Sequence, residues 1–145
     1  MITYKIFVDG SCRANGNGGI GIVWLKNGEK ILDYSKGFKG VTNNKMELVA
    51  ILYAISSIKK PIDSLEIVSD SEYCIGVLTN PKWKPKKNVK LIEFIKKIIN
   101  SKQELIKNPI KWTHTRGHQT NDSENTKWNN LADKLCTNAS NMILD

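Results

Sequence analysis

Residues 20–34 read Ile-Gly-Ile-Val-Trp-Leu-Lys-Asn-Gly-Glu-Lys-Ile-Leu-Asp-Tyr, two β-forming runs on either side of Asn27-Gly28. Both turn residues tolerate a positive φ, which the tight two-residue turn of a β-hairpin requires. The stretch therefore predicts an antiparallel hairpin built from residues 20–25 and 30–34. A third β-rich run, Ile2 to Val8, precedes it and ends at the turn signal Asp9-Gly10. With residues 15–19 as a loop, three consecutive antiparallel strands are expected.

The hydrophobic period becomes helical after Asn44, which predicts an amphipathic helix reaching Ile58. Further along, the pattern predicts a strand over 65–69, a short helix ending at 78, a helix marked by 91–99, a strand over 110–114, a loop over 117–126 and a last helix carrying 131 and 135. This order is typical of an α/β fold. We expect a mixed five-stranded sheet, three antiparallel strands and then two parallel ones, with helices on both faces. No repeat or linker is visible, so residues 1–145 are expected to form one domain.

The composition is that of an ordinary folded protein, because 40% of its 145 residues are hydrophobic and 25% are charged. No apolar run approaches the roughly 20 residues that span a bilayer, and the first residues lack the apolar core of a signal peptide. The three cysteines, Cys12, Cys74 and Cys136, are odd in number and show no CxxC spacing. We therefore expect reduced thiols, a cytoplasmic location and no membrane partner.

The net charge of +8 lies in one segment of the chain. Between Lys82 and Lys111 there are ten lysines and only two acids, so basic and acidic residues balance in the remainder. A local positive excess favours binding to a polyanion such as a nucleic acid, since phosphate contacts release condensed counterions. The alternatives are a solvated lysine-rich surface, an acidic partner or a membrane surface.

Four acidic residues fall at distinctive places in this predicted layout. Asp9 and Asp70 each end a predicted strand, where ligands gather in open α/β sheets. Glu47 lies on the first turn of the first long helix, and Asp133 lies inside the last one. Each also has a structural explanation: an Asx-turn for Asp9, a capping box of Asn44 with Glu47, an N-cap for Asp70 and a solvated helix position for Asp133.

Several motifs occur together in one order along nearly the whole chain. They are Asp9-Gly-Ser-Cys12, Thr42-Asn-Asn-Lys-Met-Glu-Leu48, Val68-Ser-Asp-Ser71, Arg116-Gly-His118 and Asn129-Asn-Leu-Ala-Asp-Lys-Leu135. In these motifs and in the predicted order of elements, the sequence resembles the ribonuclease H family, of the bacterial and retroviral kind. The resemblance implies an endoribonuclease that hydrolyses the RNA strand of an RNA–DNA hybrid with a divalent metal, usually Mg²⁺ and alternatively Mn²⁺.

The resemblance also assigns roles to residues. Asp9, Glu47, Asp70 and Asp133 match the family's four metal-binding carboxylates, and His118 matches the mobile-loop histidine thought to assist proton transfer or product departure. This register starts the last motif at Asn129 rather than Asn125, which leaves a long loop after His118. The chemistry suits the residue types, because hard divalent cations prefer carboxylate oxygens. Two such ions roughly 3.5–4 Å apart can activate water and stabilise the departing oxyanion.

Substrate contacts follow from the same resemblance. It implies minor-groove contacts of Asn15, Asn43 and Asn44 with the hybrid, where 2′-hydroxyls mark the RNA strand. Thr42 and Asn88 match a pocket for a phosphate of the DNA strand. The segment Pro81-Lys-Trp-Lys-Pro85 is too short for the basic helical handle of many bacterial members.

The lysines of this segment, Lys82 and Lys84, are expected to serve with Trp83 as a reduced handle. The lysines expected to bind the substrate are Lys84, Lys86 and Lys87. Trp83 is equally well explained as a core anchor, and the role of Glu72 stays open. The expected partner is an RNA–DNA hybrid, bound by a monomer. The competing hypotheses are a nucleic-acid-binding module with a decayed active site and a DNA-cutting relative of the same fold.

Overall fold

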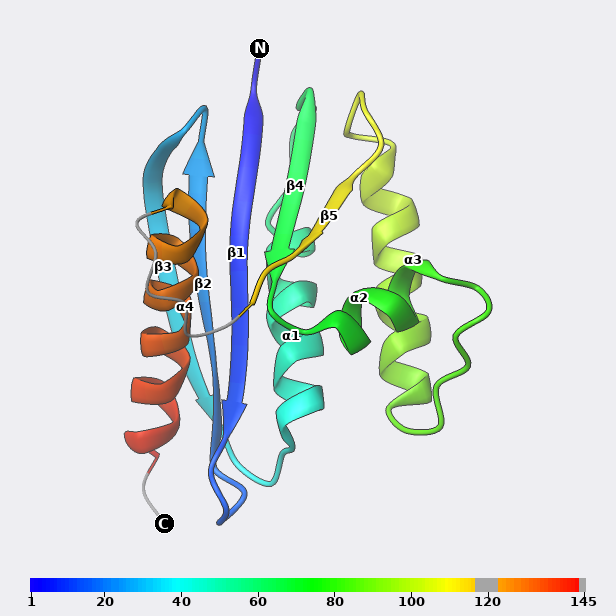
Figure 1. Cartoon of the computed structure of the whole chain (residues 1–145). Coiled ribbons are helices and arrows are strands. Elements are labelled where there is room, and N and C mark those ends of the chain that lie inside the picture. The colour runs from blue at the N-terminus through cyan, green and yellow to red at the C-terminus, as the bar shows by residue number, and fades with distance from the viewer. Residues whose placement is uncertain (117–122, 144–145) are drawn as a thin grey trace.

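The predicted hairpin turn is present, with φ angles of 50° at Asn27 and 87° at Gly28. The computed structural model describes residues 1–116 and 123–143. Figure 1 shows the elements in chain order: β1 (Thr3–Cys12), β2 (Gly18–Lys26), β3 (Glu29–Phe38), α1 (Asn43–Ser56), β4 (Ser64–Ser69), α2 (Glu72–Thr79), α3 (Val89–Gln103), β5 (Lys111–His114) and α4 (Glu124–Asn141). None of the described helices is long and apolar enough to cross a membrane.

The strands form one mixed sheet in the order β3-β2-β1-β4-β5. β1 pairs antiparallel with β2, and β2 pairs antiparallel with β3. β4 pairs parallel with β1 on one side and with β5 on the other. These pairings confirm the predicted fold class, with β1 at the centre of the sheet.

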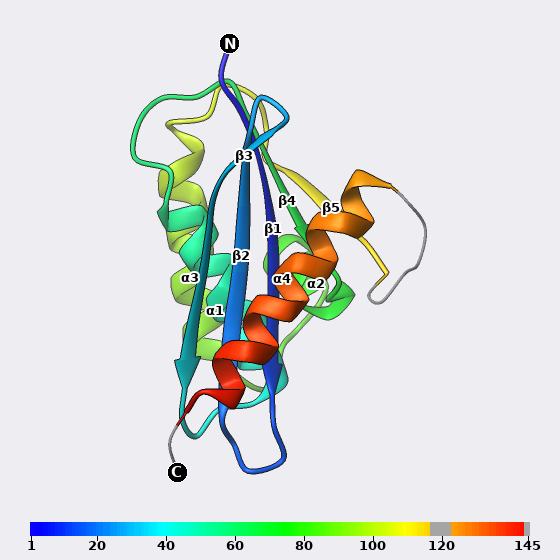
Figure 2. The ribbon, with the colours of Figure 1, turned by 90° about the vertical axis from the view of Figure 1, so that its left-hand side faces the viewer.

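Helices cover both faces of this sheet, as Figures 1 and 2 show: α1 and α3 lie on one side and α4 on the other. Side chains alternate along β1 accordingly, because successive residues of a strand point to opposite faces. Ile6 and Val8 belong to the core beneath α1, and Phe7 belongs to the core beneath α4. By the same alternation Asp9 points to the α4 face and Gly10 to the α1 face.

Helix α4 approaches β2 closely because the strand carries glycines where the helix crosses it. A Cβ on Gly19 would overlap the carbonyl oxygen of Cys136, and a Cβ on Gly21 would overlap that of Ala132. Gly21 is the cross-strand partner of Asp9. Because these glycines have no side chains, α4 packs close to β2, and its side chains reach the neighbouring strand β1 near Asp9.

Several of the sequence-based boundaries and caps are wrong. β2 begins at Gly18, inside the predicted loop 15–19, and β3 continues to Phe38, because the two strands pair along their whole length. β1 continues to Cys12, so Asp9 lies inside the strand, because its pairing with β2 extends past the turn signal. The last helix begins at Glu124, within the predicted loop, because the Ser123 side chain caps it by accepting from the Thr126 amide. Helix α1 is likewise capped by Thr42 rather than by Asn44.

Candidate active site

Asp9 and Glu47 meet where β1 passes beneath the first turn of α1. The two elements touch through Gly10, since a Cβ there would overlap the backbone of Met46 and Glu47. The Gly10 amide donates to Oδ1 of Asp9 at 2.9 Å and to Oε1 of Glu47 at 3.2 Å. Asp9 is 2% exposed and Glu47 8%. Glu47 therefore turns to the strand and takes no part in capping its own helix.

Asp70 joins this pair from the end of β4. The parallel register sets Ser69 beside Val8, so the chain after β4 emerges next to Asp9. One oxygen each from Asp9, Glu47 and Asp70 lie within 4.8 Å of one another. The capping role goes to the neighbouring Ser71, whose hydroxyl accepts from the Cys74 amide at 3.1 Å.

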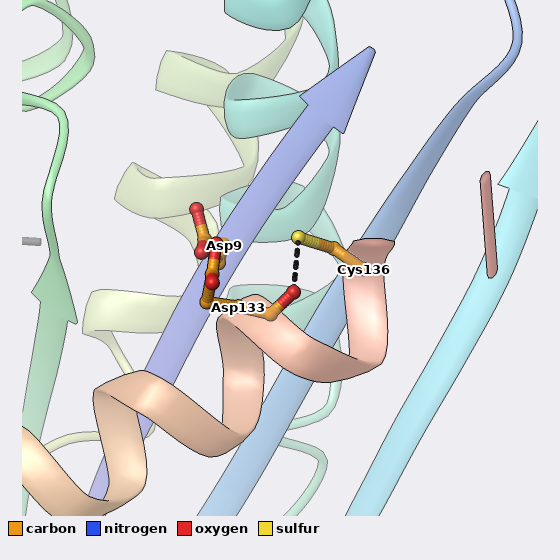
Figure 3. Close-up of side chains that lie close together, drawn as sticks. All are labelled: Asp9, Asp133 and Cys136. Carbon is orange, nitrogen blue, oxygen red and sulfur yellow. Dashed lines mark hydrogen bonds between the residues drawn. The ribbon is translucent and has the colours of Figure 1, made fainter. Parts of the chain in front are cut away.

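Helix α4 contributes a second group of donors around the same Asp9. One carboxylate oxygen each from Asp9 and Asp133 and the Sγ of Cys136 lie within 4.8 Å of one another (Figure 3). The thiol donates to the carbonyl oxygen of Asp133 at 3.1 Å. The four predicted carboxylates are thus brought together, with Asp9 common to both groups. Cys136, expected from the sequence only as a reduced thiol, is a donor that the sequence does not predict.

Two carboxylate oxygens of the cluster are buried and have no hydrogen-bond partner among the described residues, Oδ2 of Asp9 and Oε2 of Glu47. A buried polar atom without a partner is costly, so such atoms mark a place for a missing ligand. Carboxylate oxygens in this number suit a hard divalent cation. The donor set therefore fits the divalent metal that the sequence implied.

Burial changes the protonation of these groups. Burial, with the negative charges of Asp70 and Asp133 adding to it, raises the pKa of Asp9 from its usual 3.8 to about 8. Burial and the charge of Asp9 likewise raise the pKa of Glu47 well above its usual value. Burial also raises the pKa of the Cys136 thiol, which is therefore neutral near pH 7.

These shifts predict a pH-dependent stability of the metal-free protein. A raised carboxyl pKa stabilises the folded state at low pH, and that stability is lost as the pH rises through the folded-state value. In EDTA we expect the free energy of unfolding to fall as the pH rises from 3.8 to about 8. Saturating Mg²⁺ should reduce the fall, because it binds the ionised carboxylates. Urea unfolding at several pH values, with and without Mg²⁺, measures this; a pH-independent free energy in EDTA would contradict it.

The polar residues matched to substrate contacts lie in the loop after β1 and at the starts of two helices. His118 lies outside the described residues. Asn15 is exposed after β1, where its Oδ1 accepts from the Asn17 amide at 2.9 Å. The other polar residues matched to substrate contacts lie at helix starts: Thr42, Asn43 and Asn44 at α1, and Asn88 before α3 with a φ of 57°.

The lysine-rich segment between α2 and α3 leaves its charges exposed, including those of Lys84, Lys86 and Lys87. Trp83, 37% exposed, lies against Gly76 of α2 and makes an edge contact with Tyr73 at 5.8 Å between ring centroids. The ring thus anchors the segment to α2 while part of it still faces solvent. Glu72 is exposed on the first turn of α2, where an acid suits the helix dipole.

Comparisons with known proteins agree with one another. The model of the family described as RNase H matches residues 2–141. A protein named Ribonuclease H from Clostridium botulinum (strain Hall) is 35% identical over 152 residues, covering 92% of this chain and 93% of that protein. A Ribonuclease H from Actinobacillus pleuropneumoniae serotype 5b is 38% identical over 125 residues, covering 81% of this chain and 80% of its own length.

A solved structure shares the fold. The crystal structure of LC11-RNase H1 in complex with RNA/DNA hybrid superposes with a TM-score of 0.75, covering 95% of this chain and 96% of that chain at 23% identity. At this identity the likeness concerns the fold, and the two sequence relatives carry the family relationship.

Proposed function

The chain belongs to the ribonuclease H family and is a ribonuclease H hydrolase, and we propose that it cleaves the RNA strand of RNA–DNA hybrids with two divalent metal ions. The observation that carries the proposal is the pair of donor groups sharing Asp9, whose buried Oδ2 has no hydrogen-bond partner in the described part of the chain. A shared carboxylate is what a site for two adjacent cations requires.

In this proposal each metal ion is bound by its own group of carboxylates, and Asp9 belongs to both groups. Asp9, Glu47 and Asp70 would hold one ion, and Asp9 with Asp133 the other. When bound, the ions supply an activated water and a stabilised leaving oxyanion. Mg²⁺ suits the carboxylate donors, and Mn²⁺ is the alternative.

The protein's own groups orient this site. The Gly10 amide holds one oxygen of Asp9 and one of Glu47, which would leave their other oxygens available to bind the metals. The ring of His114 lies 3.3 Å from the carbonyl oxygen of Asp70 and ties β5 to the end of β4. His118 is assigned to proton transfer or product release.

Substrate binding is proposed on the side of α1 and the lysine-rich segment. Asn15, Asn43 and Asn44 are exposed and carry amide groups suited to 2′-hydroxyls, and Thr42 with Asn88 is assigned to a phosphate of the DNA strand. One chain supplies all four carboxylates, so we propose a monomer with a single catalytic domain. Its three free cysteines fit a reducing compartment such as the cytoplasm.

The proposed specificity is tested with three substrates of one sequence: an RNA–DNA hybrid, an RNA duplex and a DNA duplex. In Mg²⁺ we expect cleavage of the RNA strand of the hybrid alone. Replacing its central ribonucleotides with deoxyribonucleotides should remove cleavage there, because recognition depends on 2′-hydroxyls. Equal cutting of the DNA duplex would indicate a DNA-cutting relative, and binding without any cutting a decayed nuclease.

A second prediction concerns the lysine-rich segment. Replacing Lys82, Lys84, Lys86 and Lys87 with Gln should weaken hybrid binding and reduce its salt dependence. The slope of log affinity against log salt changes by about 0.7–0.9 per phosphate contact, so four contacts amount to roughly three units. Anisotropy titrations at several salt concentrations measure the slope. An unchanged slope would mean that this surface is merely solvated.

The control replaces two lysines outside this segment, Lys59 and Lys60, with Gln. Both are exposed just beyond α1 and before β4, at the end of β4 opposite Asp70. Their replacement removes positive charge without touching the proposed binding side, so the salt slope should stay close to that of the parent protein.

A further inference from the structure

Cys136 gives the active site a donor that the proposed hydrolysis does not use. It follows Asp133 by three residues on α4, so both side chains lie on one face of the helix, toward β1. Figure 3 shows the carboxylate of Asp133 close to that of Asp9, with the thiol of Cys136 beside them. Their donor atoms and a carboxylate oxygen of Asp9 all lie within 4.8 Å of one another.

This donor set differs in kind from the one formed by Asp9, Glu47 and Asp70. Three carboxylates suit a hard ion such as Mg²⁺, whereas a thiolate beside two carboxylates selects a thiophilic ion of the Zn²⁺ or Cd²⁺ type. Around a tetrahedral ion with bonds of about 2.0–2.3 Å, donors are separated by about 3.3–3.8 Å. The group therefore needs side-chain shifts of only about an ångström to close on an ion.

A second observation points to a ligand at this place. Asp9 is 98% buried, its exposed fraction being 2%, and its Oδ2 has no hydrogen-bond partner within residues 1–116 and 123–143. Asp133 is only partly buried, so its carboxylate connects the group to solvent.

We propose that Asp9, Asp133 and Cys136 form an inhibitory site for a thiophilic divalent ion, which excludes one catalytic metal because both use Asp9 and Asp133. On binding, the thiol loses its proton to water and a metal–sulfur bond forms, with no change of oxidation state. The inhibition rests on the proposed function, whereas the binding does not. The site would make the enzyme sensitive to the balance between Mg²⁺ and thiophilic ions.

The test is a titration of the metal-free protein with Cd²⁺, followed by the ultraviolet charge-transfer band of a cadmium thiolate. The parent protein should show a band that saturates with one equivalent and is displaced by excess Mg²⁺. Cys136→Ser should lose this band while keeping a donor to the Asp133 carbonyl. Cys74→Ser is the matched control: Cys74 is also fully buried, but it belongs to neither donor group. Cys12→Ser removes the remaining, partly exposed thiol.

In hydrolysis assays at fixed Mg²⁺, Cys136→Ser should raise the Cd²⁺ concentration for half inhibition at least about tenfold, relative to that variant's own rate without Cd²⁺. Circular dichroism checks folding, and Cys136→Ala replaces the serine variant if that one is unfolded. A band that persists without Cys136, disappears without Cys74, or resists Mg²⁺ would overturn the site. A band with the expected behaviour in a protein that cuts no hybrid would instead overturn the proposed function alone.

Discussion

Asp9→Asn should lower Mg²⁺-dependent hydrolysis at least about a thousandfold, because Asp9 is the one carboxylate common to both donor groups. Asparagine keeps the size of the side chain and an oxygen for the Gly10 amide, but it loses the charge that holds a cation. Each thousandfold corresponds to about 4 kcal/mol of transition-state stabilisation. Single-turnover cleavage of a labelled hybrid measures the loss.

The same variant should be more stable than the parent protein in EDTA near pH 7.5. Burial raises the pKa of Asp9 to about 8, so on folding near pH 7.5 this carboxylate either takes up a proton or stays as a costly buried charge, and asparagine needs neither. We expect a gain of at least about 1.4 kcal/mol, the equivalent of one pKa unit. A loss of stability would mean that Asp9 serves mainly as a structural residue.

Asp33→Asn is the control for both measurements. Asp33 lies on β3, outside both donor groups, and forms an ion pair with Lys30 at 2.6 Å. Its loss should cost at most about 1 kcal/mol, as exposed pairs do, and leave hydrolysis unchanged. Activity of Asp9→Asn near that of Asp33→Asn would remove Asp9 from the metal site.

The fold was predictable because its signals are local. The Asn27-Gly28 turn sets an antiparallel hairpin, and the change from a strand to a helical period marks each crossover. The boundaries were less predictable, because they depend on partners distant in sequence. β1 runs on to Cys12 only because β2 is there to pair with it, and Ser123 starts α4 through a side-chain cap hidden in a polar run.

The candidate site was predictable to the extent that motifs carried it. The four acids were identified from their motifs, and the structure gathers them although they are far apart in the chain. Cys136 was missed because a lone cysteine carries no signal of its own. Its spacing of three residues from Asp133 on a predicted helix was the one available clue. The contact between Gly10 and Glu47 needs the tertiary packing of α1 on β1, which no local pattern encodes.

Gly21 packs directly against α4, and there we expect the largest effect of any change outside the acids. In Gly21→Ala the new Cβ overlaps the carbonyl oxygen of Ala132 and lies 2.7 Å from the amide nitrogen of Cys136, both backbone atoms of α4. Backbone cannot turn aside as a flexible side chain does, so the helix must move away from β2. Overpacking of this kind costs about 1–3 kcal/mol.

The displacement should also reduce catalysis, because Asp133 travels with α4 while Asp9, paired with Gly21, stays on the sheet. A misplacement of about 1 Å lowers a rate about a hundredfold. We therefore expect hydrolysis per folded molecule to fall on that scale, with a weaker apparent affinity for Mg²⁺. Gly28→Ala is the control: its Cβ meets no atom of the described residues within 4 Å, and its cost comes from a φ of 87° at the hairpin turn. The Gly28→Ala protein should lose stability but keep the parent activity per folded molecule. If Gly21→Ala and Gly28→Ala were equally active per folded molecule, the extra Cβ at Gly21 would not displace Asp133, and the prediction would be wrong.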